Sequence, residues 1–257
     1  MRRIIFSIFS DNVNLDHKSV NDYKISQFKK YKQKLIDCKQ KYADFCHADF
    51  ILHDVNIVDY NKIQFEKILL YEKYAAEYDE IMYLDFDVIP THRAPNIFES
   101  FDMNTICMYP LKRDLHLIDL KTAIDRDWLD NQNVFNKTCA KKAMLLLDDI
   151  NGNDLLYNTG VVVSNSEAAK NIQFEYRLDE MNLLLDEAKE DSLYPIEISK
   201  NFYYNNEVYM SYLVERYDIP HTDLSMAWNF IIDEFQPDPV DSAYFIHYVN
   251  KDFHKSL

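Results

Sequence analysis

The stretch Ile81-Met-Tyr-Leu-Asp-Phe-Asp-Val-Ile-Pro90 decides how the rest of the sequence is interpreted. Its first half is a short apolar run, which predicts a buried strand over residues 80–85. Asp85 and Asp87 follow at the end of that strand. On a regular strand these two side chains would point to opposite faces, so both can reach one ion only if the chain turns there. Val88-Ile-Pro90 supplies such an end.

Paired carboxylates at a strand end indicate a site for a hard divalent cation. Mg²⁺ and Mn²⁺ typically take one or two carboxylates and complete their coordination with phosphate and water. A charged strand terminus without a ligand is the competing interpretation, because Asp-X-Asp alone is a common pattern. The surrounding segments favour the ion site.

Alternating strands and helices flank this stretch, which predicts an α/β fold with parallel pairing through right-handed crossovers. In open parallel sheets, ligands bind beyond the carboxyl ends of the strands, where Asp85 and Asp87 fall. The charged, poorly periodic segment 111–132 is predicted to be a variable substrate loop. We predict strands at 3–9, 50–52, 80–85, 105–108 and 156–164, and helices at 26–46, 61–74, 136–149, 167–190 and 206–217.

The composition limits the classes of function. A chain of 257 residues that is 47% hydrophobic can bury one large core, and no apolar stretch is long enough for a membrane helix. A net charge of −15 argues against sequence-independent binding of nucleic acid. An anionic ligand would need a local positive charge on this protein, such as a bound cation. Four cysteines without paired spacing indicate a reducing compartment, and we expect a cytoplasmic protein. Abundant Asn, Lys, Ile and Tyr suggest an AT-rich genome, of a microbe or of a virus in its host cell.

The stretch Lys73-Tyr-Ala-Ala-Glu-Tyr-Asp-Glu-Ile-Met-Tyr-Leu-Asp-Phe-Asp-Val88 resembles GT-A fold nucleotide-sugar glycosyltransferases, especially the glycogenin-like and bacterial galactosyltransferase families. The resemblance implies a Rossmann-like, mixed but mostly parallel sheet flanked by helices. It implies a single domain over 1–257, with a nucleotide-binding half at 1–110 and an acceptor-side half at 111–257. It also implies that Asp85 and Asp87 hold Mn²⁺ or Mg²⁺, bridging the phosphates of a nucleotide-sugar donor, and the family pattern favours a UDP-linked one.

The stretch Leu156-Tyr-Asn-Thr-Gly-Val-Val-Val-Ser-Asn165 resembles the family segment "FNxGxxxxN". The resemblance implies that Asn158 touches the donor sugar and that Gly160 allows close approach. The glycine is informative on physical grounds too, since the chain contains only Gly152 and Gly160. A glycine inside an apolar strand weakens it unless a bulge or a ligand needs the room.

The stretch Phe245-Ile-His-Tyr-Val-Asn-Lys251 resembles the family segment "HfxGxxKPW", although the glycine and the Pro-Trp of that segment are missing. The resemblance implies that His247 is the third protein ligand of the metal and that Lys251 meets the phosphates. A lone histidine is more often a structural residue, which is our interpretation of His92, His116 and His221.

Asn205-Asn-Glu207 lies where the family usually has "DQD" before a helix, so the leading acid is lost. The resemblance makes Glu207, Asn206 and Asn158 the candidate catalytic residues. A helix N-terminus that favours Asn and Glu as cap and dipole partners is an equally good interpretation of Asn205 to Glu207. Ala227-Trp-Asn229 resembles the family's "wN", which usually supports the acceptor side.

In the family, the loop after the first strand binds nucleobase and ribose, which corresponds here to residues 7–12. Lys67 lies one position away from the family's basic residue that contacts the nucleotide-sugar donor. A charge on a solvated helix face is the more common role for such a lysine. The predicted metal ligands are Asp85, Asp87 and His247. The predicted donor-binding residues are Ser7, Phe9, Asp11, Asn12, Lys67, Asp85, Phe86, Gly160 and Lys251.

These observations predict a metal-dependent glycosyltransferase that moves a hexose from a UDP-type donor to a hydroxyl of a glycan or another acceptor, with retention at the anomeric carbon. One alternative is a sugar nucleotidyltransferase, but residues 7–14 lack the glycines and the lysine of a triphosphate loop. The other is a non-catalytic, glycan-binding relative of the fold. The intact pair of Asp85 and Asp87 speaks against it.

Overall fold

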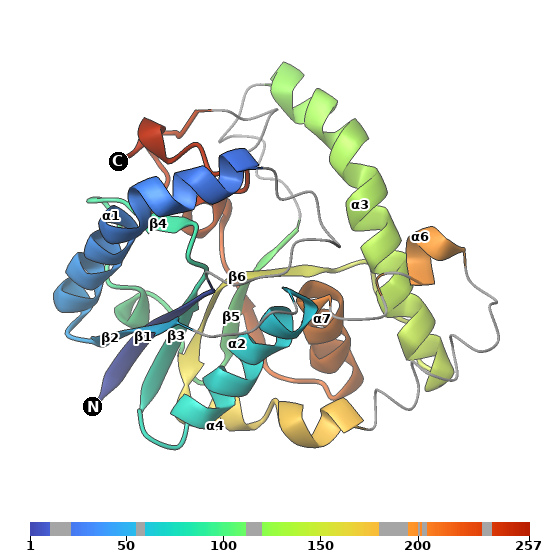
Figure 1. Ribbon diagram of the computed structural model, residues 1–257. Helices are drawn as coiled ribbons and strands as arrows, with labels where there is room; N and C mark the ends of the chain where they lie inside the picture. The colour runs from blue at the N-terminus through green and yellow to red at the C-terminus, as the bar shows by residue number, and fades with distance from the viewer. Residues whose placement is uncertain are drawn as a thin grey trace.

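The computed structural model describes residues 1–10, 22–54, 60–111, 120–179, 195–199, 201, 205–232 and 238–257. Its centre is a six-stranded sheet in the order β2-β1-β3-β6-β5-β7 (Figure 1). In the described part of this sheet β6 alone runs against the other strands, so the predicted mostly parallel sheet is confirmed. The strands are β1 (Arg3–Phe9), β2 (Asp49–Asp54), β3 (Glu80–Leu84), β5 (Ile106–Pro110), β6 (Tyr157–Asn165) and β7 (His221–Asp223).

A second, three-stranded sheet has the order β4-β9-β8 and consists of β4 (Val88–Pro90), β8 (Phe230–Ile232) and β9 (Phe245–Tyr248). Only Asp85, Phe86 and Asp87 separate β3 of the large sheet from β4 of the small one. The chain therefore changes sheets at the turn that the sequence predicted. Strands β4 and β9 are antiparallel, and their register places Val88 opposite His247.

Helices cover both faces of the large sheet, which makes three layers (Figure 1). Helices α2, α4 and α7 pack on one face, and α3 packs on α7. On the other face, α1 contacts β1, β2 and β4. The helices are α1 (Asp22–Cys46), α2 (Tyr60–Tyr74), α3 (Leu120–Leu147), α4 (Ser166–Lys170), α6 (Ile196–Ser199) and α7 (Asn206–Arg216), with 3-10 turns η1 (Ile97–Glu99), η3 (Met226–Trp228) and η4 (Phe253–Lys255).

Side chains of the central strands alternate between two hydrophobic cores. In β3, Ile81 and Tyr83 belong to the core under α2 and α7, whereas Met82 and Leu84 belong to the core under α1 and the small sheet. Because both faces of the strand are buried, its sequence is a continuous apolar run rather than an alternating one. This burial brings the chain to Asp85 and Asp87, of which Asp85 is partly exposed and Asp87 is buried.

Two sequence predictions about helices are wrong. Helix α3 already begins at Leu120, so residues 120–132 of the predicted substrate loop are helical; the apolar face that packs on α7 lies further along α3, around Ala140 and Met144. The predicted helix 167–190 is interrupted after α4. Ile172 and Phe174 are both fully buried, and two residues that lie two apart on one helix point in different directions. The chain turns there, with Gln173 in the left-handed region at φ 46°.

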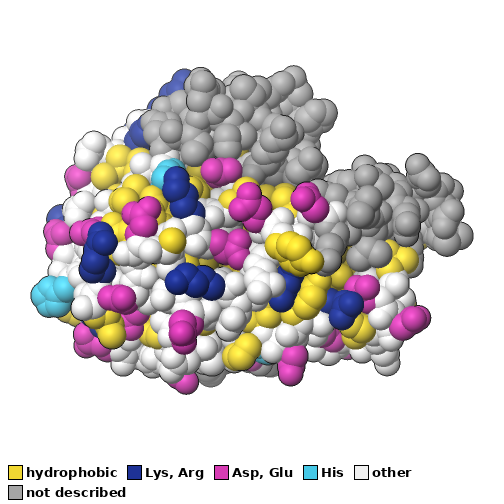
Figure 2. All heavy atoms as spheres, turned by 90° about the horizontal axis from the view of Figure 1, so that it is seen from below, with side chains coloured by type: hydrophobic (Ala, Val, Ile, Leu, Met, Phe, Trp, Pro, Cys, Tyr) yellow, Lys and Arg dark blue, Asp and Glu magenta, His cyan; other side chains and the backbone are white. Residues whose placement is uncertain are grey.

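One face of the molecule carries acidic and basic side chains intermingled with scattered apolar ones (Figure 2). None of the helices that the structure describes has the length and apolarity to cross a membrane. The four cysteine thiols are free. Strands from both sides of residue 110 pair in the large sheet, and the division into two functional halves stays a prediction.

Candidate metal centre and active site

The turn at Asp85-Phe86-Asp87 is fixed by backbone hydrogen bonds and by its central side chain. The Asp85 N–H donates to Gly160 O at 2.8 Å, and the Val88 N–H donates back to Asp85 O at 3.0 Å. The Phe86 ring is buried against Phe9, with their centroids 4.7 Å apart. With Phe86 anchored in the core, the carboxylates on either side of it are held at the carboxyl end of β3.

Lys39, on α1, supports this turn. It was not assigned a role in the site from the sequence. Its side chain is fully buried, and its ammonium group donates to Phe86 O at 2.9 Å and to Val88 O at 2.6 Å. Burial lowers the pKa of Lys39. A signal was present, because Lys39 lies four residues after the buried Leu35 and so falls on the apolar face of the predicted helix.

Asp85, Asp87 and His247 meet as predicted, with one potential ligand atom from each lying within 4.8 Å of the others. His247 Nε2 lies 3.5 Å from Asp87 Oδ2, and the Lys251 ammonium donates to the same oxygen. Burial alone would raise the pKa of Asp87, but Lys251 and His247 hold it well below its ordinary value. The carboxylate is therefore charged near neutral pH. Two carboxylate oxygens and an imidazole nitrogen are a donor set that fits Mn²⁺.

Gly160 makes room for the histidine. A Cβ at this position would lie 2.8 Å from His247 Cε1 and 3.0 Å from its Nδ1, closer than atoms pack without moving. The sequence predicted a close approach at Gly160, and the group that approaches it in the structure is the His247 ring. Gly160 thus touches two parts of the candidate metal centre, since its carbonyl also binds the Asp85 N–H.

Lys67 is buried, so the more common role considered for it, a charge on a solvated helix face, is wrong. Its ammonium donates to Thr159 O at 3.1 Å and lies 3.6 Å from Asp85 Oδ1. It also lies 4.9 Å from the centre of the Tyr83 ring, and the Tyr83 hydroxyl donates to Asp85 Oδ1 at 2.5 Å. The hydrogen bond from Tyr83 and the ion pair with Lys67 both meet Asp85 Oδ1 and orient the carboxylate, so Lys67 joins the candidate site from α2.

Glu207 forms the opposite end of the site, where it meets Asn158, another of the predicted catalytic residues. Its Oε1 accepts a hydrogen bond from Asn158 Nδ2 at 2.6 Å, and its Oε2 is paired with the Lys137 ammonium. Burial would raise the pKa of Glu207, but Lys137 with help from Lys67 and Asn158 lowers it below its ordinary value. Lys137, on α3, was missed by the sequence interpretation.

The helix N-terminus considered for Asn205 to Glu207 is present. Asn205 is the N-cap of α7, and its side chain accepts from the Val208 N–H at 3.3 Å. Asn206 is buried and donates to the side chain of Gln64 on α2. Of the three residues, only Glu207 reaches Asn158, and a catalytic role for Asn206 stays a prediction.

Of the residues predicted to bind the donor nucleotide, Asp11 and Asn12 lie outside the described residues. Ser7 is fully buried, and its hydroxyl donates to Leu84 O at 2.5 Å, which ties β1 to β3. Phe9 packs on Phe86 at the edge of the core. Ser7 and Phe9 lie beside the turn at Asp85, and Phe86 lies within it; their part in donor binding stays a prediction.

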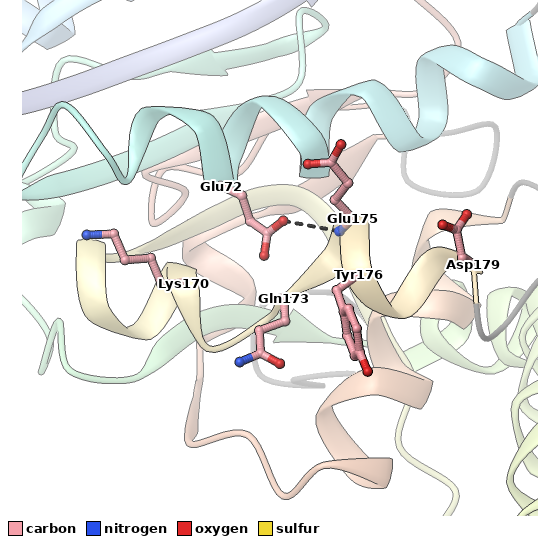
Figure 3. A pocket seen from close by; sticks show the side chains of 6 residues that line it. All are labelled: Glu72, Lys170, Gln173, Glu175, Tyr176 and Asp179. Atoms are coloured by element: carbon pink, nitrogen blue, oxygen red, sulfur yellow. Dashed lines mark hydrogen bonds between the residues drawn. The ribbon is translucent and has the colours of Figure 1, made fainter.

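A surface hollow of about 470 Å³ lies elsewhere, between α2 and the segment after α4 (Figure 3). The Glu72 side chain points into it (Figure 3). Its Oε1 accepts a hydrogen bond from the Phe174 backbone N–H at 2.7 Å, and its Oε2 accepts one from the Glu175 backbone N–H at 3.3 Å. Glu72 thereby caps the start of the helical segment at 174–179. The other residues around the hollow are Lys170, Gln173, Tyr176 and Asp179, and none of the predicted site residues is among them.

Comparisons of the sequence with protein-family models and with curated proteins gave no match. Among solved structures, the chain is similar to a glycosyltransferase involved in the glycosylation of the major capsid of PBCV-1, with 14% identity, a TM-score of 0.51, and coverage of 99% of this chain and 98% of that one. It is also similar to the galactosyltransferase LgtC in complex with donor and acceptor sugar analogs, with 14% identity, coverage of 96% and 87%, and a TM-score of 0.48. At such identity, the first of these likenesses shows a shared fold. The chain therefore has the GT-A glycosyltransferase fold that the sequence predicted.

Proposed function

We propose that this protein is a metal-dependent glycosyltransferase that moves a hexose from a nucleotide-diphosphate sugar to a hydroxyl of a glycan or another acceptor. The observation that carries the proposal is the convergence of Asp85, Asp87 and His247 within 4.8 Å, beyond the carboxyl end of β3. That edge of an α/β sheet is where ligands bind. A UDP-linked donor is the form that the sequence resemblance favours.

At the metal end, the residues are arranged for a diphosphate. Asp85, Asp87 and His247 would hold Mn²⁺ or Mg²⁺, which when bound supplies positive charge against the charge that develops on a departing diphosphate. Lys251 contributes a second, permanent cation beside Asp87. In a chain with a net charge of −15, these two local positive charges give an anionic donor a place to bind.

At the other end, Glu207 is ionised near neutral pH because its pKa lies below the ordinary value. An ionised carboxylate offers negative charge or accepts a proton, and it is a poor general acid. This suits the support of positive charge on a sugar ring during transfer, or the orientation of an acceptor hydroxyl. Retention at the anomeric carbon, which the sequence resemblance implies, is part of the proposal.

The experiment that tests the proposal is mass-spectrometric detection of donor hydrolysis with Mn²⁺ across a panel of UDP-, GDP- and dTDP-sugars, with and without EDTA. We expect at least one donor to be hydrolysed in an EDTA-sensitive manner, and candidate acceptors can then be tested with that donor. Absence of turnover with every donor, together with calorimetry that shows no Mn²⁺-dependent nucleotide binding, would overturn the proposal. Tight glycan binding under those conditions would indicate the non-catalytic alternative.

A further inference from the structure

A continuous chain of buried polar groups joins the two ends of the candidate site. His247 Nδ1 lies 3.0 Å from Asn229 Oδ1, and Asn229 Nδ2 donates to Asn158 Oδ1 at 2.6 Å. Asn158 Nδ2 donates in turn to Glu207 Oε1 at 2.6 Å. Asn229 is fully buried, and the other three side chains are at most 13% exposed. In this setting each polar group depends on its partner in the chain.

Two groups that cannot reverse their hydrogen-bonding roles fix the orientation of Asn158. The backbone N–H of Gly160 donates to Asn158 Oδ1 at 2.9 Å, and a peptide N–H can only donate. The ionised carboxylate of Glu207 can only accept. A flipped Asn158 amide would place its NH₂ group against the Gly160 N–H and its oxygen against the Glu207 carboxylate. Both contacts would be repulsive, so the amide has one orientation.

The orientation of Asn158 then determines that of Asn229. Because Asn158 presents an oxygen, Asn229 must turn its NH₂ group towards it, and its own oxygen therefore faces His247 Nδ1. An amide oxygen only accepts, so Nδ1 must carry a hydrogen. A neutral imidazole carries a single ring hydrogen, which leaves the lone pair on Nε2. Nε2 is the nitrogen that faces Asp87.

We infer that Asn229 and Asn158 are positioning residues that fix the tautomer of His247, with the hydrogen on Nδ1 and with Nε2 free to bind a metal ion. The metal part of this inference rests on the proposed function. The tautomer part does not, because the 3.0 Å contact between Nδ1 and Asn229 Oδ1 is present without the ion, and it is a closer hydrogen-bond contact for a neutral ring than the 3.5 Å from Nε2 to Asp87 Oδ2. Groups that orient a metal-binding histidine through its second nitrogen are known to affect metal affinity strongly.

The test compares two substitutions of one buried residue. Asn229→Leu keeps the approximate size of the side chain but removes the acceptor for His247 Nδ1. Asn229→Asp keeps that acceptor, although its other oxygen faces Asn158 Oδ1 and should lower the folding stability. A purely structural role predicts that metal binding falls with stability in both variants. The inference predicts that only Asn229→Leu loses it.

The first readout is ¹⁵N NMR of the His247 ring in the metal-free protein at about pH 8.5, well above the ordinary histidine pKa of about 6.5. His247→Gln identifies the signals. We expect the Nδ1–H pattern in the wild type and in Asn229→Asp, and a predominantly Nε2–H pattern in Asn229→Leu. The Nδ1–H pattern in all three proteins, or the Nε2–H pattern in the wild type, would overturn the inference.

The second readout is Mn²⁺ affinity in the presence of UDP, followed by electron paramagnetic resonance. We expect Asn229→Leu to bind roughly 10–100-fold more weakly than the wild type. Asn229→Asp should stay within roughly threefold of it. Ser164→Ala is the matched control, because it removes a buried 2.8 Å hydrogen bond to Tyr71 from the same strand as Asn158 and should leave the affinity unchanged.

The two readouts separate failure of this inference from failure of the proposed function. A wild-type protein that binds no Mn²⁺ with UDP would overturn the metal centre, while the NMR spectra would still decide the tautomer. If the wild type binds Mn²⁺ and Asn229→Leu binds it equally tightly, the metal centre stands and the role of Asn229 is overturned.

Discussion

The two ends of the candidate site are built by different means. At the metal end, Asp85 and Asp87 flank the step from β3 to β4, and His247 lies in β9, which pairs with β4. At the other end, Glu207 and Lys137 come from helices α7 and α3 and meet through their side chains alone. Backbone pairing fixes the first group, and side-chain contacts fix the second.

The difference indicates which part of the site can change without loss of the fold. The position of His247 beside Asp87 depends on the register of β4 and β9, whereas Glu207 and Lys137 depend on the attraction of their opposite charges. The metal end should therefore respond to changes of shape as well as of charge, and the end around Glu207 should respond mainly to changes of charge. Four substitutions test this contrast.

The largest effect is expected at the metal end from Asp87→Asn, which keeps the shape but removes the charge that Lys251 and His247 stabilise. We expect donor turnover to fall roughly 10²–10³-fold, the range seen when one electrostatic group of an active site is removed. Steady-state kinetics with Mn²⁺ measures this. Asp241→Asn is the control, because the Asp241 side chain is 98% exposed and should leave turnover unchanged. Equal activities of the two variants would contradict the assignment of Asp87.

Gly160→Ala tests whether the metal end responds to shape alone. The added Cβ would meet His247 Cε1 at 2.8 Å, so the ring must move and Mn²⁺ affinity should fall roughly 10-fold, within the range for disturbed support of a ligand. The free energy of unfolding should also fall by about 1–3 kcal/mol because of overpacking. Calorimetric titration and urea denaturation measure the two effects.

Gly152→Ala is the matched control for that change. Its Cβ would meet Leu145 Cδ1 at 2.5 Å, a clash outside the candidate site. It should lower stability and leave Mn²⁺ affinity as it is. If both alanine variants bind Mn²⁺ like the wild type, the close contact between Gly160 and His247 has no bearing on the metal.

Lys39→Met tests the support beneath the turn. Loss of the ammonium leaves the carbonyls of Phe86 and Val88 without this donor, and relief of the buried charge offsets part of that cost. We expect the free energy of unfolding to fall by about 2 kcal/mol, measured by urea denaturation. The exposed Lys41, substituted to Met on the same helix, should change it by less than about 0.5 kcal/mol. A stability gain in Lys39→Met would mean that desolvation of the charge outweighs its hydrogen bonds.

The smallest effect on stability is expected from Glu207→Gln, where charge matters more than shape. The folded-state pKa of Glu207 is depressed, so its ionised form adds stability above the unfolded-state pKa of about 4.3, and this contribution is lost as the pH falls through the folded value. Near neutral pH the variant should be less stable by about 1 kcal/mol. The difference from the wild type should shrink below about pH 4.

Urea denaturation between pH 3 and pH 7 measures this difference, and Glu77→Gln, an exposed position, provides the control. A difference between Glu207→Gln and the wild type that stays constant over the whole range would contradict the pairing of Glu207 with Lys137.

The metal end was largely predictable from the sequence. The apolar run that ends before Asp85, the segment Val88-Ile-Pro90 after the turn and the rare glycine at 160 are local features with direct structural meaning. The bond between Asn229 and His247 was not predictable, because it depends on the pairing of β8 with β9, and short strands do not reveal their partners. The fixed tautomer could therefore emerge only from the assembled structure.

Buried lysines were the main source of error. Lys67 and Lys39 both lie inside the molecule, where each donates to backbone carbonyl groups. Lysine is almost always exposed, so a pattern based on polarity places it on the surface unless a partner is known. The partner of Lys67 is carried by β6, far along the chain, and is invisible to local periodicity. Lys137 was likewise expected on a helix but given no role, because its partner Glu207 lies far along the chain.

The pairing of β4 with β9 has a consequence for synthesis of the protein. Asp85 leaves the ribosome 166 residues before Lys251 (251 − 85), and at 5–20 residues per second this delay is roughly 8–33 s. Until β9 has been translated, β4 lacks its antiparallel partner, and Asp87 lacks His247 and Lys251, the two neighbours on its carboxylate. The nascent chain can form most of the large sheet before then, whereas its metal centre is completed only after β9 has been translated.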